Sequence, residues 1–318
     1  MGTTLAIVLP VFGLVVIGWV TGRTPLLSPE GVRGINNFVL YVAIPALLFR
    51  TAGSGRVVDA FEPGLALSFF LASWGLLGVA WLTGRHLLRL PRGEAVMFAM
   101  GTCYGNTVLI GVPLVLAAYG DAGSVPLAII VALHSPLLQP VVILLIEGAR
   151  GGDGLRPTLR ATGAALVRNP ILLAMAAGIL WGTTGWPLPE VVERLVGLLA
   201  GAAGPTALFA LGAALARQPF GGRRAGEHMD TAVMIAAKLI VHPFAVWLLA
   251  GPVFGLNPLT VAVATIMAAL PVGATVFVLA QGYGVYIGRA TTAVVVSTAL
   301  AAVTTALLLG LFAIPRAG

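Results

Sequence analysis

Two interrupted apolar stretches, GTCYGNTVLIGVP (101–113) and AALPVGATVFVLAQGYG (268–284), decide how this chain folds. Both carry glycine, proline or polar residues inside an otherwise apolar run, namely Gly101, Gly105, Asn106, Gly111, Pro113, Pro271, Gly273 and Thr275. Proline removes a backbone donor and frees a carbonyl in the preceding turn. Lipid cannot satisfy such groups, so the backbone at both interruptions has to face protein or a water-filled cavity. The pair predicts a binding site inside a membrane-embedded helical bundle.

The composition is that of an integral membrane protein. Apolar residues make up 58% of the 318 residues and charged residues only 9%, against roughly a quarter charged in soluble domains. The mean hydropathy is +1.01. A soluble enzyme or a nucleic-acid-binding protein of this size would need far more polar surface, in spite of the pI near 10.5. The apolar stretches are continuous, which excludes an alternating transmembrane β-barrel.

Apolar runs predict an all-α polytopic protein with ten transmembrane helices, the fourth and ninth of them broken. The first run begins without a positively charged segment, so we interpret it as a span and not as a cleaved signal. One cysteine, Cys103, permits no internal disulfide and no cysteine-based metal cluster, and we expect no cofactor. The expected spans are residues 4–21, 34–52, 64–84, 94–118, 124–147, 168–184, 190–216, 231–251, 258–281 and 289–314.

The arginines set the expected orientation. The connections that follow even-numbered spans, together with the C-terminal tail, hold three: Arg50, Arg56 and Arg316. Positive residues accumulate on the cytoplasmic side, so we expect a multi-pass protein of the cell (inner) membrane with both termini outside. Insertion accounts for the net charge of +7 without a nucleic-acid partner. Connections after odd-numbered spans hold thirteen arginines: Arg23, Arg33, Arg85, Arg89, Arg92, Arg150, Arg156, Arg160, Arg168, Arg217, Arg223, Arg224 and Arg289.

The chain also resembles itself at a nearly constant offset. GWVTGRTPLL (18–27) is similar to LWGTTGWPLP (180–189), and IPALLF (44–49) is similar to GPTALF (204–209). We therefore expect one repeat over 1–147, a cytoplasmic connecting loop over 148–167, and a second repeat over 168–318. Five spans in each half require opposite topology, and inverted repeats are typical of alternating-access transporters.

The N-terminal block 8–49, the YGNTVLIGVPL segment and the ALPVGATVFVLAQGYG segment resemble the auxin efflux carrier family over the whole chain. The resemblance implies ten helices in two inverted repeats, with helices four and nine crossing near the membrane centre, and it suggests a homodimer. It implies transport of organic anions, such as auxin or dicarboxylates. By position, Pro113 and Pro271 match the crossover prolines and Asn106 matches a polar site residue. Thr275 stands where the family often has asparagine, and the chain lacks the long loop of the large plant members.

Further polar residues lie in or beside the predicted spans. His134, Ser135 and Gln139 form a polar strip on the fifth span, which should adjoin the crossover. Tyr104 and Gln281 are expected in the wall of the site. All eleven acidic residues lie in connections or near span ends. A site with amide and hydroxyl donors, helix N-termini and no carboxylates favours a small organic anion.

Lys238 and His242 are ionisable residues within the eighth span. Lysine is costly inside a membrane, so its charge needs compensation. Three interpretations remain open for Lys238: it balances the negative ends of the broken helices, it contacts the anion, or it reaches to an interface. His134 and His242 are candidate proton carriers, because histidine titrates near neutral pH.

The sequence therefore predicts a secondary transporter of small organic anions that works by alternating access. An exchanger of H⁺ or Na⁺ on the same plan would need intramembrane carboxylates, which the spans do not offer. A membrane enzyme would need a metal-binding or nucleophile motif, and neither a His-Glu-x-x-His cluster nor a G-x-S-x-G element occurs. A membrane sensor that does not transport remains an alternative.

Overall fold

The computed structural model describes residues 2–55, 62–150, 160, 163–164, 167–217 and 227–312. Over these residues the chain is helical, and its one β-type pairing is an isolated bridge between Gly105 and Val272. The helices are α1 (Gly2–Gly22), α2 (Pro29–Phe38), η1 (Val39–Ala43), α3 (Ile44–Gly53), α5 (Pro63–Leu82), η2 (Thr83–Leu87), α6 (Arg92–Cys103), η3 (Thr107–Gly111), α7 (Val112–Tyr119), η4 (Gly120–Gly123), α8 (Ser124–Arg150), α10 (Pro170–Thr183), α11 (Glu190–Leu215), α12 (Glu227–Ala236), η5 (Ala237–Val241), α13 (His242–Leu248), η6 (Leu249–Val253), α14 (Pro258–Ala268), α15 (Ala274–Tyr283) and α16 (Ile287–Leu311).

Helices lie in each of the ten apolar stretches that the sequence predicts as spans. Four shorter apolar helices, Leu9–Gly22, Pro170–Thr183, Pro258–Ala268 and Ala274–Tyr283, lie among them. The all-helical, multi-pass character is confirmed, while the number of crossings stays a prediction. The predicted loop 148–167 and the end of the last stretch lie largely outside the described residues. Among the described residues, six helical segments are long and apolar enough to cross a bilayer: Pro29–Gly53, Pro63–Leu87, Thr107–Ala149, Glu190–Leu215, Met229–Val253 and Ile287–Leu311.

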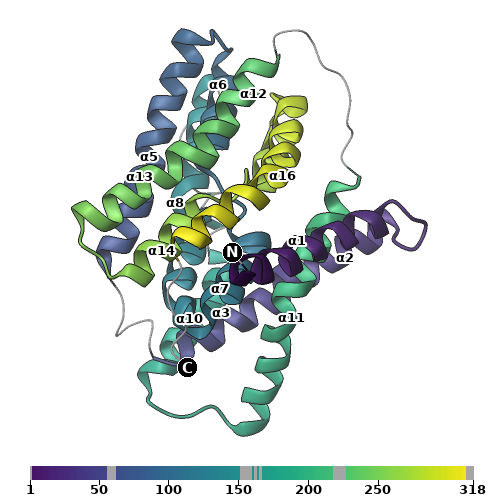
Figure 1. Cartoon of the computed structure of the whole chain (residues 1–318), viewed down its shortest axis with the longest axis vertical. Coiled ribbons are helices and arrows are strands. Elements are labelled where there is room, and N and C mark those ends of the chain that lie inside the picture. Colours follow the sequence, from purple (N-terminus) through teal and green to yellow (C-terminus); the bar gives the residue numbers. More distant parts are fainter. Residues whose placement is uncertain are drawn as a thin grey trace.

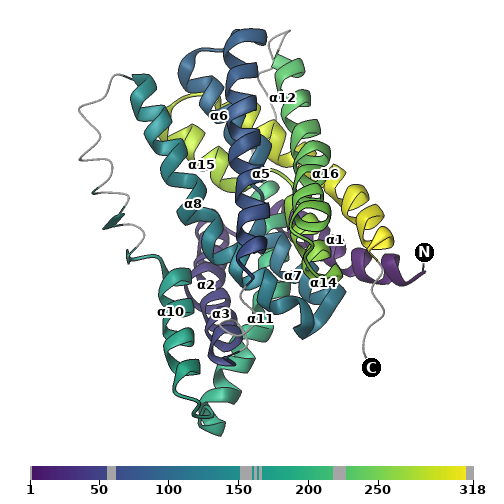
Figure 2. The same ribbon diagram turned by 90° about the vertical axis from the view of Figure 1, so that its left-hand side faces the viewer.

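The helices form two groups (Figures 1 and 2). In one group α1 packs along α11, and α3 packs between α10 and α11. Small residues allow these close contacts, because a Cβ at Gly212 would lie 1.9 Å from the Val15 carbonyl oxygen. In the other group α5 packs on α6, α13 packs on α14, and α16 contacts α12 and α15. The first group contacts the rest of the bundle through η3 and α7, which pack on α11, through α8, which packs on α3, and through α16, which packs on α1.

Several spans contain a π-helical turn directly before a proline. η1, η3 and η5 precede helices in which Pro45, Pro113 and Pro243 occupy the first turn. Proline cannot donate the usual backbone hydrogen bond, and a wider turn absorbs the mismatch without ending the helix. This explains why the first break does not lie at Pro113, which the family resemblance matched to a crossover proline. The first break lies between Cys103 and Thr107, whereas Pro113 continues a helix.

An ion-pair cluster joins three helices of the second group. Arg289 of α16 contacts Glu94 of α6 at 3.0 Å and Asp230 of α12 at 2.8 Å. Tyr286 donates its hydroxyl hydrogen to the same Asp230 oxygen over 3.0 Å. The Asp230 side chain is only 5% exposed, so its negative charge is stabilised by these partners more than by water. The cluster fixes the ends of α6, α12 and α16 relative to one another.

We expect Arg289→Gln to destabilise the protein by about 2–3 kcal/mol, because it leaves the carboxylate of Asp230 buried without its cation. Thermal unfolding of the detergent-solubilised protein measures the change. Arg194→Gln is the matched control, since Arg194 pairs with Glu190 at a site where both side chains are more than three-quarters exposed and such pairs contribute about 0–1 kcal/mol. Equal shifts in the two variants would contradict the assignment.

Candidate functional site

The two interruptions lie side by side and are hydrogen-bonded to each other. The backbone N–H of Asn106 donates to the Pro271 carbonyl over 3.0 Å, and the backbone N–H of Gly273 donates to the Tyr104 carbonyl over 2.9 Å. These bonds flank the antiparallel bridge between Gly105 and Val272. Each broken segment therefore supplies the hydrogen-bond partners that the other has lost, which is how non-helical backbone becomes stable where water is not available.

The close approach of the two backbones requires glycine at position 273. A Cβ added there would lie 2.9 Å from the Gly105 carbonyl oxygen and 2.9 Å from the ring of Tyr104. Gly273 is also the residue that precedes α15. The sequence signal at this position thus reflects contact between the two breaks and not only a flexible turn.

Four helix ends meet at the paired breaks. α6 ends at Cys103 and α14 ends at Ala268, while η3 and α15 begin after Asn106 and Gly273. The beginning of a helix carries unsatisfied N–H groups and a partial positive charge, and its end carries carbonyls and a partial negative charge. Two positive ends and two negative ends are therefore concentrated around one short backbone ladder. This ladder consists of the Asn106–Pro271 and Gly273–Tyr104 hydrogen bonds and the Gly105–Val272 bridge between them.

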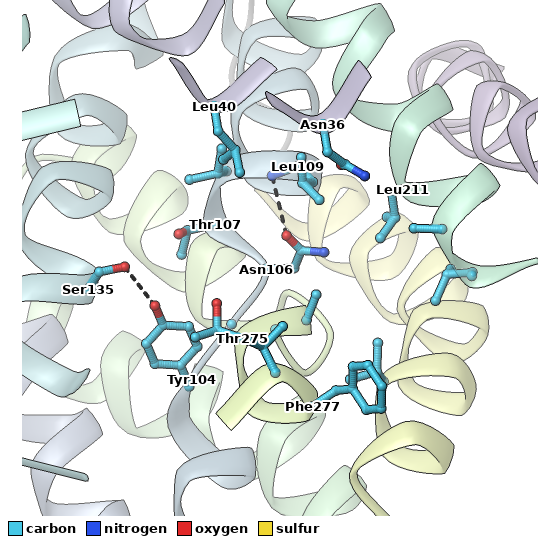
Figure 3. Close-up of a pocket in the computed structure, with 18 of the residues that line it drawn as sticks. Asn36, Leu40, Tyr104, Asn106, Thr107, Leu109, Ser135, Leu211, Thr275 and Phe277 are labelled. Atoms are coloured by element: carbon cyan, nitrogen blue, oxygen red, sulfur yellow. Dashed lines mark hydrogen bonds between the residues drawn. The ribbon is translucent and has the colours of Figure 1, made fainter. Parts of the chain in front are cut away.

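A cavity of about 810 Å³ lies against the two helix beginnings (Figure 3). Its walls are mostly apolar and include Leu40, Leu109, Leu211 and Phe277. This size and lining are typical of a small-molecule site. Six of the residues predicted from sequence line it, namely Tyr104, Asn106, Ser135, Gln139, Thr275 and Gln281.

One wall of the cavity is a hydrogen-bonded polar group. The Tyr104 hydroxyl lies 2.6 Å from the Ser135 hydroxyl and accepts from the Gln139 amide over 3.2 Å. Thr275 faces the same space beside Tyr104 (Figure 3). The bonds fix side chains from α8 against the first break, so the polar wall is held in place before any ligand arrives.

Asn106 combines a structural bond with a free donor. Its Oδ1 accepts from the Leu109 amide over 3.3 Å and so caps η3. Its Nδ2 is buried and has no hydrogen-bond partner among the described residues. Figure 3 shows this amide nitrogen on the Leu211 side of the cavity. A buried donor without an acceptor costs about 1–3 kcal/mol. A ligand acceptor that bonds to Nδ2 of Asn106 would remove this cost.

The other predicted site residues lie outside the cavity lining. Pro113 lies in the first turn of α7, and Pro271 belongs to the ladder as an acceptor. His134 is buried and its Nε2 accepts from the Gly105 amide over 3.2 Å. Lys238 and His242 are also buried, against the end of α14. The structure thus places Pro271, His134, Lys238 and His242 at the paired breaks but outside the cavity lining, and Pro113 beyond η3 beside Gly204 of α11. The roles of these residues stay predictions.

Sequence reasoning missed the wall formed by the other group of helices. Asn36 and Leu40 come from α2 and η1, and Leu211 and Ala214 come from α11. Asn36 is engaged in its own helix, where it donates to the Val32 carbonyl over 3.1 Å. The paired asparagines of INNF (35–38) were the available sequence signal, because amides are uncommon in an apolar span.

The profile of the family described as "Membrane transport protein" matches residues 3–309. A protein of Rhizobium meliloti (strain 1021), whose name gives malonate transport as a proposal, is 30% identical over 96% of this chain and 94% of its own. Auxin efflux carrier component 8 of Arabidopsis thaliana is 26% identical over 93% and 94%. The chain belongs to the auxin efflux carrier family.

Membership of the auxin efflux carrier family confirms the resemblance inferred from the sequence. The protein is a membrane transporter and not an enzyme. An uncharacterized transporter of Escherichia coli (strain K12) is also similar, at 24% identity over 91% of both chains. In the family context, the cavity beside the paired breaks is the candidate transport site.

We expect Gly273→Ala to lower stability by about 1–3 kcal/mol, because the added methyl group clashes with backbone of the opposite break. Gly282→Ala is the control on the same helix, since nothing lies within 4 Å of its Cβ position. That change is expected to be neutral or slightly stabilising. Thermal unfolding of both purified variants tests the difference, and an unchanged Gly273→Ala protein would disprove the close pairing.

Proposed function

We propose that this chain is a secondary transporter of small organic anions, carboxylates of the auxin-like or dicarboxylate kind, and that it binds them in the cavity beside the paired breaks. The observation that carries the proposal is the composition of the cavity lining. Its described residues include the arginines Arg33 and Arg217 but no aspartate or glutamate. Two helix beginnings and the free Nδ2 donor of Asn106 face the same space.

This arrangement suits a carboxylate on electrostatic grounds. The beginning of a helix acts as roughly half a positive charge and offers unpaired N–H groups to an anion. The first turns of η3 and α15 both line the cavity, through Thr107, Leu109, Ala274 and Thr275. The apolar remainder of the wall accommodates the carbon skeleton. The relatives named as a malonate transporter and an auxin efflux carrier agree with this class of substrate.

Alternating access is the proposed mechanism. The cavity lies between α2 and α11 of one helix group and α8, α15 and α16 of the other. Rocking of one group against the other would close this opening and open another on the far side. The proposed frame is ten spans in two inverted repeats, and the matching breaks in α6–η3 and α14–α15 support it.

The proposed orientation makes this conformation open to the cytoplasm of a cell with an inner membrane. Arg33 and Arg217 of the lining belong to connections that we assign to the cytoplasmic side by their arginine content. This assignment places both termini outside the cell. The proposed assembly is a homodimer. Outward movement of one negative charge gains about 2.3 kcal/mol per 100 mV when the interior is negative. Uncoupled transport of a monoanion would therefore favour export, and H⁺-driven uptake would need His134 or His242 as proton carrier.

An H⁺- or Na⁺-coupled exchanger on the same plan is less well supported. Such an exchanger binds its cations through carboxylates, and the described residues of the cavity lining include none. The cavity volume of about 810 Å³ also exceeds what a bare ion requires. A sensor that does not transport would share the cavity and is distinguished by the absence of flux.

We expect Asn106→Ala to reduce carboxylate flux into proteoliposomes roughly 5- to 150-fold, because the substrate loses a buried donor worth about 1–3 kcal/mol. Asn257→Ala is the matched control: Asn257 caps α14 through a 2.9 Å bond from the Thr260 amide but lies outside the cavity lining. Flux is measured for malonate, succinate and indole-3-acetate at equal reconstituted protein.

The control separates loss of a helix cap from loss of a ligand donor. Both asparagines cap a helix, so a capping effect alone would lower both fluxes to a similar extent. Wild-type flux in Asn106→Ala would remove this residue from the site. Ligand binding to the native protein also raises its melting temperature by mass action. Stabilisation by organic cations but by none of the carboxylates would overturn the assignment of substrate class.

A further inference from the structure

The chain contains a single lysine, Lys238, and the structure buries it completely. The other seventeen basic residues are arginines. Lys238 lies in the π-helical turn η5, and its exposed fraction is 0%. None of the ion pairs formed by the described residues includes it. An ammonium group in this position needs another source of negative potential.

That source is the end of α14. The Lys238 ammonium donates to the carbonyl of Ala268, the last residue of that helix. Carbonyls at the end of a helix lack intrahelical donors and carry a partial negative charge. The break of α6 lies on the other side, where a Cβ at Gly105 would be 3.4 Å from the ammonium nitrogen. The charge therefore stands where α6 and α14 both end.

A neutral histidine completes the site. His242 Nδ1 lies 3.3 Å from the Lys238 nitrogen, and Nε2 lies 2.9 Å from the Ser73 hydroxyl. Ser73 in turn donates to the Phe69 carbonyl over 2.7 Å. Nδ1 also lies 3.2 Å from the Ala268 carbonyl oxygen. Because the Ser73 hydroxyl hydrogen is donated to Phe69, Nε2–H is the donor to Ser73, and the unprotonated Nδ1 accepts from the ammonium, which also donates to Ala268. The ammonium is thereby bonded to α14 and α13, and Ser73 of α5 holds the histidine in place.

Charge is balanced across the ladder. Each helix end contributes roughly half a negative charge, so the ends of α6 and α14 together offset about one ammonium. The helix beginnings of η3 and α15 face the cavity on the other side of the ladder. Lys238 and His242 do not belong to the described lining of that cavity. The negative ends are thus neutralised from within the protein, and the positive ends remain available to a ligand.

We propose that the Lys238 ammonium occupies a monovalent-cation site built by the ends of the two broken helices, and that removing the side chain leaves a site for a small alkali cation. Carbonyl oxygens are ligands for hard cations. This assignment concerns the stability of the ladder and does not depend on which solute is carried. Its failure and the failure of the anion-transport proposal are therefore distinguishable.

Melting temperatures of three variants test the proposal. Lys238→Met keeps much of the side-chain volume but removes the charge, and it is expected to lower the melting temperature by roughly 5 °C or more. Lys238→Ala removes both charge and volume and makes room for an ion. Met234→Ala is the control, because Met234 lies one turn earlier, is also 0% exposed and contacts Gly101 without carrying a charge.

Each protein is unfolded in NaCl, LiCl, KCl and choline chloride at equal ionic strength, so that general screening is matched. Lys238→Ala is expected to melt several degrees higher in at least one alkali chloride than in choline chloride, whereas wild type, Lys238→Met and Met234→Ala show no such difference. A melting temperature of Lys238→Met at or above wild type would overturn the proposal. So would a salt response of Lys238→Ala equal to that of Met234→Ala.

A second measurement uses the wild-type protein, in case the variants do not fold. Reductive methylation followed by peptide mass spectrometry reports on Lys238 alone among side chains, since the chain has no other lysine. The proposal predicts protection in the native state and full methylation after denaturation. Rapid methylation of the native protein that added carboxylate suppresses would show that the amine faces the ligand cavity, and it would overturn the cation-site assignment.

Discussion

The pairing of two broken helices through their own backbone is the interaction on which the rest of this structure depends. At the depth of a bilayer, an unsatisfied N–H or C=O group costs several kcal/mol, and water is not available to satisfy it. The bonds from Asn106 to Pro271 and from Gly273 to Tyr104 solve this problem for both segments together. Neither break would be stable alone. A transporter gains from this arrangement because the same discontinuity exposes four helix ends at one place.

The helix ends are separated by sign. The beginnings of η3 and α15 face the cavity with Asn106 and Thr275, while the end of α14 receives the ammonium of Lys238 on the opposite side. Helix dipoles act over about one turn, so the short ladder is enough to keep the two sides distinct. In the proposed function, these helix beginnings and the neutral donors beside them attract the anion, together with Arg33 and Arg217 of the cavity lining.

Much of the site could be predicted because its chemistry is local in sequence. Glycine, proline and amide residues inside apolar runs mark breaks, and six polar residues chosen on that basis line one cavity. The position of the first break was harder to predict. Pro113 was an obvious candidate, but the π turn η3 accommodates it, and the chain breaks at Gly105, where the opposite backbone approaches.

Contacts between distant helices could not be predicted from pattern. The wall from α2 and α11 depends on how two groups of helices meet, which apolar periodicity does not specify. The role of His134 could not be predicted from pattern either. It accepts from the Gly105 backbone N–H, and this bond depends on the position of α8 along its own axis relative to the ladder. Lys238 was visible as a costly residue in sequence, but its partner is a main-chain carbonyl and carries no sequence signal.

The central claim, that the paired breaks border a hydrated cavity that binds anions, is tested most directly by cysteine accessibility. Cys103 is the only cysteine and is buried, so Thr275→Cys in a Cys103→Ala background gives one reporter at the cavity wall. The account predicts labelling by a charged, membrane-impermeant thiol reagent in inverted vesicles, several-fold slower with bound carboxylate. Thr265→Cys, at a buried position outside the described lining, should stay unlabelled. No labelling at position 275, or labelling that no carboxylate slows, would contradict it.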